Sequence, residues 1–155
     1  MALAISAFSD IKLIPGMTSK DADQDGVTYL YPYPKLLERA NGVRKGAYLY
    51  GKRFDFDAGS YHGYNYWRRA LPTLVGRIVE NIRKSDPFYE LVDFPDNEGV
   101  IGPRTSAKLA RDFAKWKVQA RVVPRLGGVD DFYEKYCMWL RAFELASHHG
   151  AVSFH

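Results

Sequence analysis

Apolar side chains recur at helical spacing in three separate segments of this 155-residue chain, and this repetition limits the fold more than any other feature. The segments are residues 60–82, 104–121 and about 130–147. Their apolar stripes are Tyr64, Trp67, Leu71, Leu74, Val75, Ile78 and Ile82; Leu109, Phe113, Trp116 and Ala120; and Phe132, Tyr136, Trp139, Phe143 and Ala146. The spacing predicts three amphipathic helices, the first capped by Ser60 and kinked near Pro72.

Other segments have the pattern of strands. Residues 46–59 alternate apolar and polar side chains, which predicts a strand or a hairpin bent around Gly51. Strands are also expected at the start of 27–34, in 86–96 and in 151–155, and a short helix in 34–41. Together the patterns predict an α+β fold, with three to four substantial helices packed on a small, mostly antiparallel sheet. We expect one compact domain over residues 27–155, preceded by a weakly patterned segment, 1–26.

Composition indicates which cellular compartment to expect for the protein. The chain has one cysteine, Cys137, so an intrachain disulfide is impossible. This fits a reducing compartment. An apolar run approaching the ~20 residues of a membrane span is missing from the sequence. We therefore expect a cytoplasmic protein with no membrane partner. The net charge of +4 favours anions in general and does not by itself indicate nucleic acid.

The stretch GSYHGYNYWRR, residues 59–69, is the first candidate for a binding site. His62, Tyr66 and Arg69 are spaced i, i+4 and i+7, so they share the helix face opposite the apolar stripe. Tyr61 and Asn65 lie beside that face. Aromatic rings can stack on a base, and an arginine can pair with phosphate.

The loop NEGVIGPRTS, residues 97–106, is the second candidate. It leads into a helix capped by Thr105 or Ser106, and free N–H groups at a helix start attract anions. Glu98, Arg104 and Thr105 would line this side. We expect the two segments to border one cavity that binds an anionic, nucleotide-like small ligand.

Three segments together resemble a family of small uncharacterised proteins from bacterial and phage genomes. They are SYHGYNYWRRAL, DFPDNEGVIGPRTSAKLARDF and AFELASHHGAVSFH, and the resemblance covers about residues 46–155. Pro95 and Asn97 stand where the family often has Ser or Cys near the acidic residues. The family has no settled activity. Its phage association implies a sequestering or counter-defence protein for a signalling nucleotide.

Other functions stay open. His148, His149 and His155, with Asp93, Asp96 and Glu98, suggest a metal-assisted hydrolase acting on a phosphate ester. That set lacks a recognised metal-ligand spacing, so we expect no metal and no cofactor, and a non-enzymatic or weakly catalytic protein.

A protein-interaction or inhibitor module would also explain exposed tyrosines. Nucleic acid is a less favoured partner. The basic stripe of Arg104, Lys108, Arg111 and Lys115 follows an acidic segment that would repel a polyanion.

Overall fold

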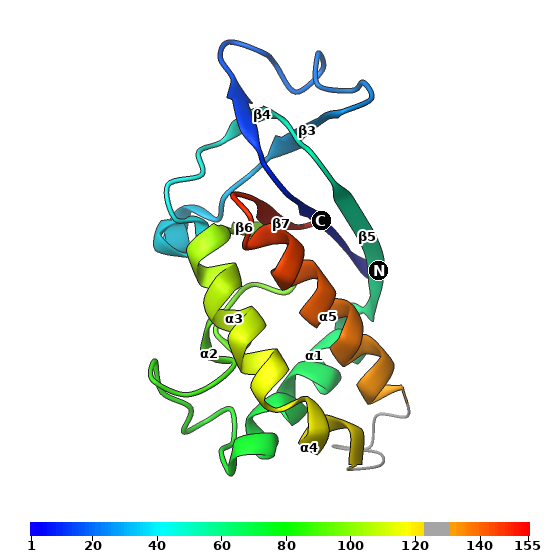
Figure 1. The fold of residues 1–155 in the computed structure, drawn as a ribbon, viewed down its shortest axis with the longest axis vertical. Coiled ribbons are helices and arrows are strands. Elements are labelled where there is room, and N and C mark those ends of the chain that lie inside the picture. The colour runs from blue at the N-terminus through cyan, green and yellow to red at the C-terminus, as the bar shows by residue number, and fades with distance from the viewer. Residues whose placement is uncertain (123–130) are drawn as a thin grey trace.

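A four-stranded antiparallel sheet divides the molecule, with the main helices on one side of it (Figure 1). The computed structural model describes residues 1–122 and 131–155. The strand order is β5 (Arg53–Ser60), β1 (Ala2–Phe8), β7 (Ala151–Phe154) and β6 (Gly99–Ile101). The closing strand expected in 151–155 is confirmed.

Strand β1 lies inside this sheet, between β5 and β7, although residues 1–26 carry little sequence pattern. The side chains of Leu3, Ile5 and Ala7 are buried toward the helices. Residues two apart on a strand share a face, so Ala4, Ser6 and Phe8 lie on the other side. This sheet therefore has one apolar face that packs in the main core, and a second face that lies away from the helices.

The helices pack on the apolar face. They are α1 (Tyr61–Ala70), α3 (Pro103–Lys115), α4 (Lys117–Val122) and α5 (Phe132–Ala146), with the short 3₁₀ helix η2 (Leu71–Val75) and one turn, α2 (Tyr89–Val92). Helices α3 and α5 lie side by side (Figure 1). The predicted stripes of both are buried, with Trp116 only partly so. The Ser60 cap is confirmed, because its Oγ accepts from Gly63 N at 2.9 Å.

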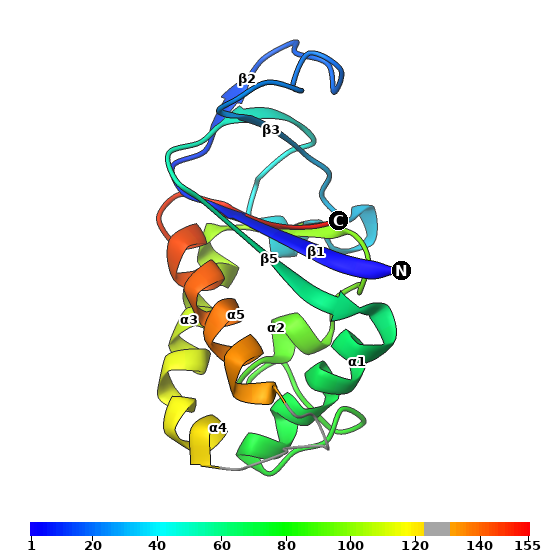
Figure 2. The same cartoon turned by 90° about the vertical axis from the view of Figure 1, so that its right-hand side faces the viewer.

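A second, three-stranded antiparallel sheet lies on the side away from these helices (Figure 2). Its order is β2 (Lys12–Ile14), β4 (Gly46–Leu49) and β3 (Val27–Leu30), and the 3₁₀ helix η1 (Pro34–Ala40) lies between β3 and β4 in the chain. The prediction of a hairpin around Gly51 is wrong, because β4 pairs with β2 and β3 whereas β5 pairs with β1. The chain does bend there, and Gly51 N donates to Ser9 O at 2.8 Å.

Two further expectations fail in residues 71–96. The predicted strand in 86–96 is instead the turn α2, since Arg39 donates to the carbonyls of Glu90 and Asp93 and holds that backbone curled. The apolar stripe predicted over residues 60–82 also ends earlier than expected. Helix α1 ends at Ala70, η2 ends at Val75, and Ile78 is 52% exposed.

The fold class is α+β, as predicted, in a single domain with two small sheets. The predicted helix over 104–121 is divided at Trp116 into α3 and α4. The last helix begins at Phe132, and position 130 of its predicted range lies outside the described residues. Among the helices of the described ranges, none has the length and apolar character needed to cross a bilayer.

Candidate functional site

The predicted site residues of α1 do not share one site. His62 and Tyr66 line a hollow of about 470 Å³ together with Lys135 of α5. Asn65 faces elsewhere, because its Nδ2 donates to Asp96 Oδ2 at 2.6 Å. Arg69 forms an exposed ion pair with Glu80 at 2.8 Å. Tyr61 is partly buried against the main core.

Arg68, the neighbour of Arg69 in α1, has a structural role. Its Nη1 donates to the carbonyl oxygens of Leu91 and Phe94, and its guanidinium lies over the Tyr64 ring at 4.9 Å. These contacts hold the 91–94 backbone against α1 and leave the guanidinium occupied.

The second group of predicted residues does not join the first. Glu98 lines a different cavity, while Arg104 and Thr105 lie in the first turn of α3. The expected shared cavity is therefore wrong. Ligand binding by the individual residues stays a prediction.

Asn41, at the C-terminal end of η1, caps the start of α3, which corrects the predicted cap. Asn41 Oδ1 accepts from Thr105 N at 2.9 Å, so Asn41 supplies the cap instead of Thr105 or Ser106. A Cβ added to Gly102 would stand 2.1 Å from the carbonyl oxygen of Ala40. Backbone therefore packs closely against Gly102, and the Thr105 N–H is already bonded to Asn41.

Replacing Asn41 with alanine should lower the free energy of unfolding by about 1–2 kcal/mol, the usual cost of a lost cap. Asn41 has φ of 54°, a left-handed conformation, so alanine adds strain as well. Asn41→Gly removes the cap without that strain and should cost less. Urea denaturation would measure both. Equal loss in the two variants would contradict the contribution from strain, and no loss in either would contradict the cap.

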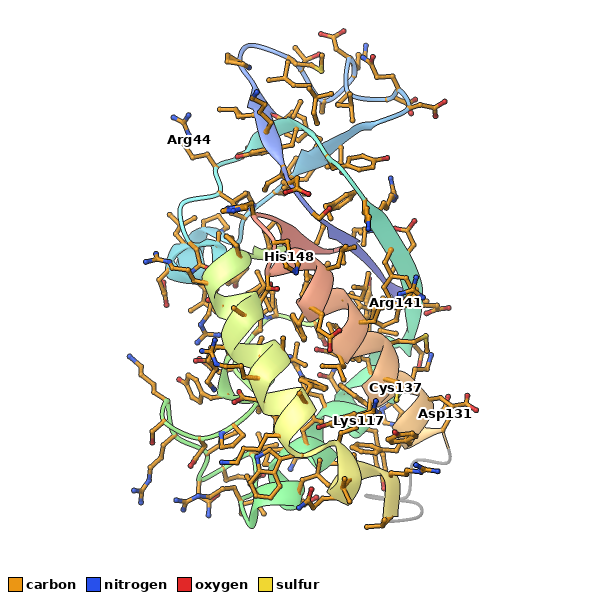
Figure 3. All side chains as sticks on the ribbon, viewed as in Figure 1. Arg44, Lys117, Asp131, Cys137, Arg141 and His148 are labelled. Atoms are coloured by element: carbon orange, nitrogen blue, oxygen red, sulfur yellow. The ribbon has the colours of Figure 1, made fainter. Side chains whose placement is uncertain are left out.

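The histidines considered for a metal do not assemble. His148 lies at the C-terminal end of α5 and lines a hollow with Arg141, whereas His155 lies beyond β7 in another cavity (Figure 3). Within residues 1–122 and 131–155, no three His, Cys, Asp or Glu side chains group closely enough to hold an ion. The metal-assisted alternative therefore lacks a ligand set in the described part of the chain.

The polar face of the four-stranded sheet carries a different and denser cluster. Ser6 pairs across the sheet with Asp55 on one side and Ser153 on the other, and the next residues on the same face are Arg53 and His155. Alternation along each strand sets them all on the side away from the helices. This face is the floor of a cavity of about 430 Å³, called the intersheet cleft below.

The walls of the intersheet cleft come from the second sheet and from the turn before β6. Tyr29 and Tyr31 have ring centroids 4.9 Å apart, and Tyr31 is 52% exposed. Lys45 Nζ lies 5.7 Å from the Tyr31 ring centroid. Asn97 and Glu98, in the turn before β6, also line the cleft. The cleft thus combines an aromatic wall with a polar, partly cationic floor, as small-ligand sites usually do.

Arg53 is the cation of this floor. Its Nε donates to Asp55 at 2.8 Å and 2.9 Å, and its Nη2 lies 3.5 Å from Ser6 Oγ. The guanidinium also covers the Phe8 ring at 5.2 Å. These contacts fix its orientation while its side chain stays 40% exposed. The contacts with Asp55 and Ser6 use Nε and Nη2, and the guanidinium also lies 6.0 Å from the Tyr50 ring.

His155 is the second polar group of the floor. Its Nε2 lies 2.9 Å from Ser6 Oγ, within hydrogen-bond distance. Partial burial lowers the pKa of His155 below the ordinary 6.5, and the Arg53 charge lowers it further, against the opposing effect of Asp55. The lowered pKa favours the neutral imidazole, and Nε2 can accept a proton in the tautomer that carries its hydrogen on Nδ1.

Among these cleft residues, sequence patterns indicated only Glu98, as a ligand-binding residue, and His155, as a possible metal ligand; the cluster around Ser6 and Arg53 was not predicted. A signal was present in the alternation of residues 53–57 and 151–155, which sets Arg, Asp, Ser and His on one face. It was missed because the side chains come together only through β1, and Ser6 and His155 are 149 positions apart.

A separate apolar hollow lies beside η1 and is lined in part by Pro32, Pro34 and Leu37. Leu37 is 58% exposed. Such a surface is compatible with the protein-interaction alternative.

Comparison of the chain with protein-family models, with curated proteins and with solved structures finds no match. We therefore infer the function from the intersheet cleft itself.

Proposed function

We propose that the protein binds a small phosphate-bearing ligand, nucleotide-like in size and shape, in the intersheet cleft. The observation that carries the proposal is the fixed Arg53 guanidinium beside Ser6 and His155, at the floor of a cavity walled by two tyrosines. Arginine presents a planar set of donors that matches phosphate oxygens.

The aromatic wall would bind the base of such a ligand. A base stacked on a tyrosine contributes about 1–3 kcal/mol, and the exposed ring of Tyr31 offers a face for it. Glu98, which also lines the cleft, can accept hydrogen bonds from sugar hydroxyls. Phosphate on the floor, base on the tyrosines and sugar near Glu98 would together occupy the cleft.

Asp55 sets a limit on the charge of the ligand. Its carboxylate offsets part of the Arg53 charge, and Glu98 adds a second negative group. Coulomb attraction alone would therefore not retain a free anion strongly. We expect the aromatic wall to supply much of the affinity, so a nucleoside monophosphate should bind more tightly than inorganic phosphate.

The test is binding of AMP, GMP and inorganic phosphate by isothermal titration calorimetry. We expect Arg53→Gln to weaken nucleotide binding by roughly 10–100-fold, because a hydrogen bond to a charged group contributes about 1.5–3 kcal/mol. In the wild type, nucleotide at 100 times its dissociation constant should stabilise the fold by about 2.7 kcal/mol.

Arg44→Gln is the matched control, since it makes the same change of charge on an exposed side chain that points away from the molecule (Figure 3). It should bind as the wild type does. The proposal is wrong if none of the three probes binds, or if the Arg53 and Arg44 variants lose affinity equally.

A further inference from the structure

We propose that Ser6 and His155 form a nucleophile and general-base pair, and that the intersheet cleft hydrolyses phosphate monoesters without a metal ion. This inference rests on the proposed function, because it needs a phosphate held at Arg53. Its basis is the 2.9 Å separation of Ser6 Oγ from His155 Nε2, with Arg53 Nη2 on the same oxygen at 3.5 Å.

The backbone holds the pair rigidly. Ser6 lies in β1, and the chain beyond β7 continues the ladder, since Ala4 and His155 exchange hydrogen bonds of 2.8 Å and 2.9 Å. Ser6 and His155 are thus diagonal neighbours on one face of an antiparallel pair, close enough for long side chains to meet. A site on strands is held more precisely than one on a loop.

The charged groups around the pair suit base catalysis. Arg53 and Asp55 face His155 from β5, Ser6 faces it from β1, and Glu98 lines the same cleft. The neutral imidazole accepts the Ser6 proton, and this activates a hydroxyl that is otherwise a weak nucleophile. Arg53 is in place for the negative charge that develops on the transferring phosphoryl group.

The reaction has two balanced steps. Ser6 Oγ attacks phosphorus and passes its proton to His155 Nε2, while the bond from phosphorus to the leaving oxygen breaks. His155 then returns that proton to the leaving alkoxide, which departs as an alcohol. In the second step water attacks the phosphoserine, His155 takes one water proton and gives it to Ser6 Oγ, and inorganic phosphate leaves.

A polar pair with only a structural role in the sheet would show the same hydrogen bond, so the test needs a chemical readout. The full chain is incubated with p-nitrophenyl phosphate, and release of p-nitrophenol is followed over time. Intact mass spectrometry after acid quenching looks for one added phosphoryl group on Ser6. We expect turnover in the wild type, and at least about 100-fold less in Ser6→Ala and His155→Gln.

Ser147→Ala is the matched control, because its hydroxyl donates to Glu144 O at the end of α5, away from the cleft. It should retain full turnover. Calorimetry with inorganic phosphate and AMP separates binding from chemistry, and Ser6→Ala should still bind both. The wild-type rate should persist below pH 6.5 and fall only as His155 becomes protonated at its lowered pKa.

The outcomes distinguish the two proposals. Binding without turnover, or turnover that survives in Ser6→Ala, overturns the catalytic inference and leaves the binding function standing. Loss of binding in every probe overturns both. A rate with the same pH profile in the His155→Gln variant would contradict His155 as the base.

Discussion

Replacing Trp139 with alanine should lower the free energy of unfolding by about 3–5 kcal/mol, the range for removing a buried tryptophan. Trp139 is fully buried on α5. Its ring centroid lies 5.1–5.8 Å from five other aromatic rings, those of Phe56, Tyr64, Trp67, Phe143 and Phe154. The loss would be a large part of the 5–15 kcal/mol that stabilises a typical domain.

Trp139→Phe is the matched control. The indole Nε1 of Trp139 is buried without a hydrogen-bond partner among the described residues, so phenylalanine removes an unsatisfied donor and leaves a smaller cavity. We expect it to cost far less than alanine. Urea denaturation followed by circular dichroism measures both. Equal loss in the two variants would contradict the smaller cost expected for phenylalanine, and an alanine variant as stable as the wild type would contradict the role of Trp139 in the aromatic cluster.

The second large effect is expected for Gly150→Ala. Gly150 joins α5 to β7, and an added Cβ would stand 1.8 Å from the carbonyl oxygen of Phe8. That atom belongs to the backbone of β1, so the clash cannot be relieved by a side-chain rotation. Overpacking of this kind costs typically 1–3 kcal/mol, and more where backbone must move.

Gly59→Ala provides the comparison. Its added Cβ meets nothing within 4 Å, although φ of 101° makes alanine strained there. We therefore expect a moderate loss at Gly59 and a larger one at Gly150, measured as midpoints of urea denaturation. A Gly150 variant as stable as the wild type would contradict the close approach of β1 to the end of α5.

The sheet explains how a polar cluster can exist beside so large an aromatic core. Side chains such as Ile5 and Phe154 enter the core, while their neighbours Ser6 and His155 lie on the opposite face. Cleft variants can therefore be made without opening a core cavity. This separation makes the binding and turnover experiments interpretable.

Local pattern predicted most of the helical framework. The stripes of residues 104–121 and 130–147 identified the buried side chains of α3 and α5, because one helix face repeats every 3.6 residues whatever it packs against. Strand β1 was missed, since Ala2–Phe8 is almost wholly apolar and shows no alternation. The segment 86–96 was assigned wrongly, because contacts from the distant Arg39 override its local preference.

The sequence by itself determined the α+β class, the core faces of the main helices and the alternation of residues 53–57 and 151–155. Only the tertiary structure decided where the candidate site lies. It closed the start of α3 with Asn41, and it set Ser6, Arg53 and His155 on one sheet face. The physical reason is the sequence distance over which each feature is set. Helical and strand periods depend on neighbouring residues, whereas strand order and register bring together segments up to 149 positions apart.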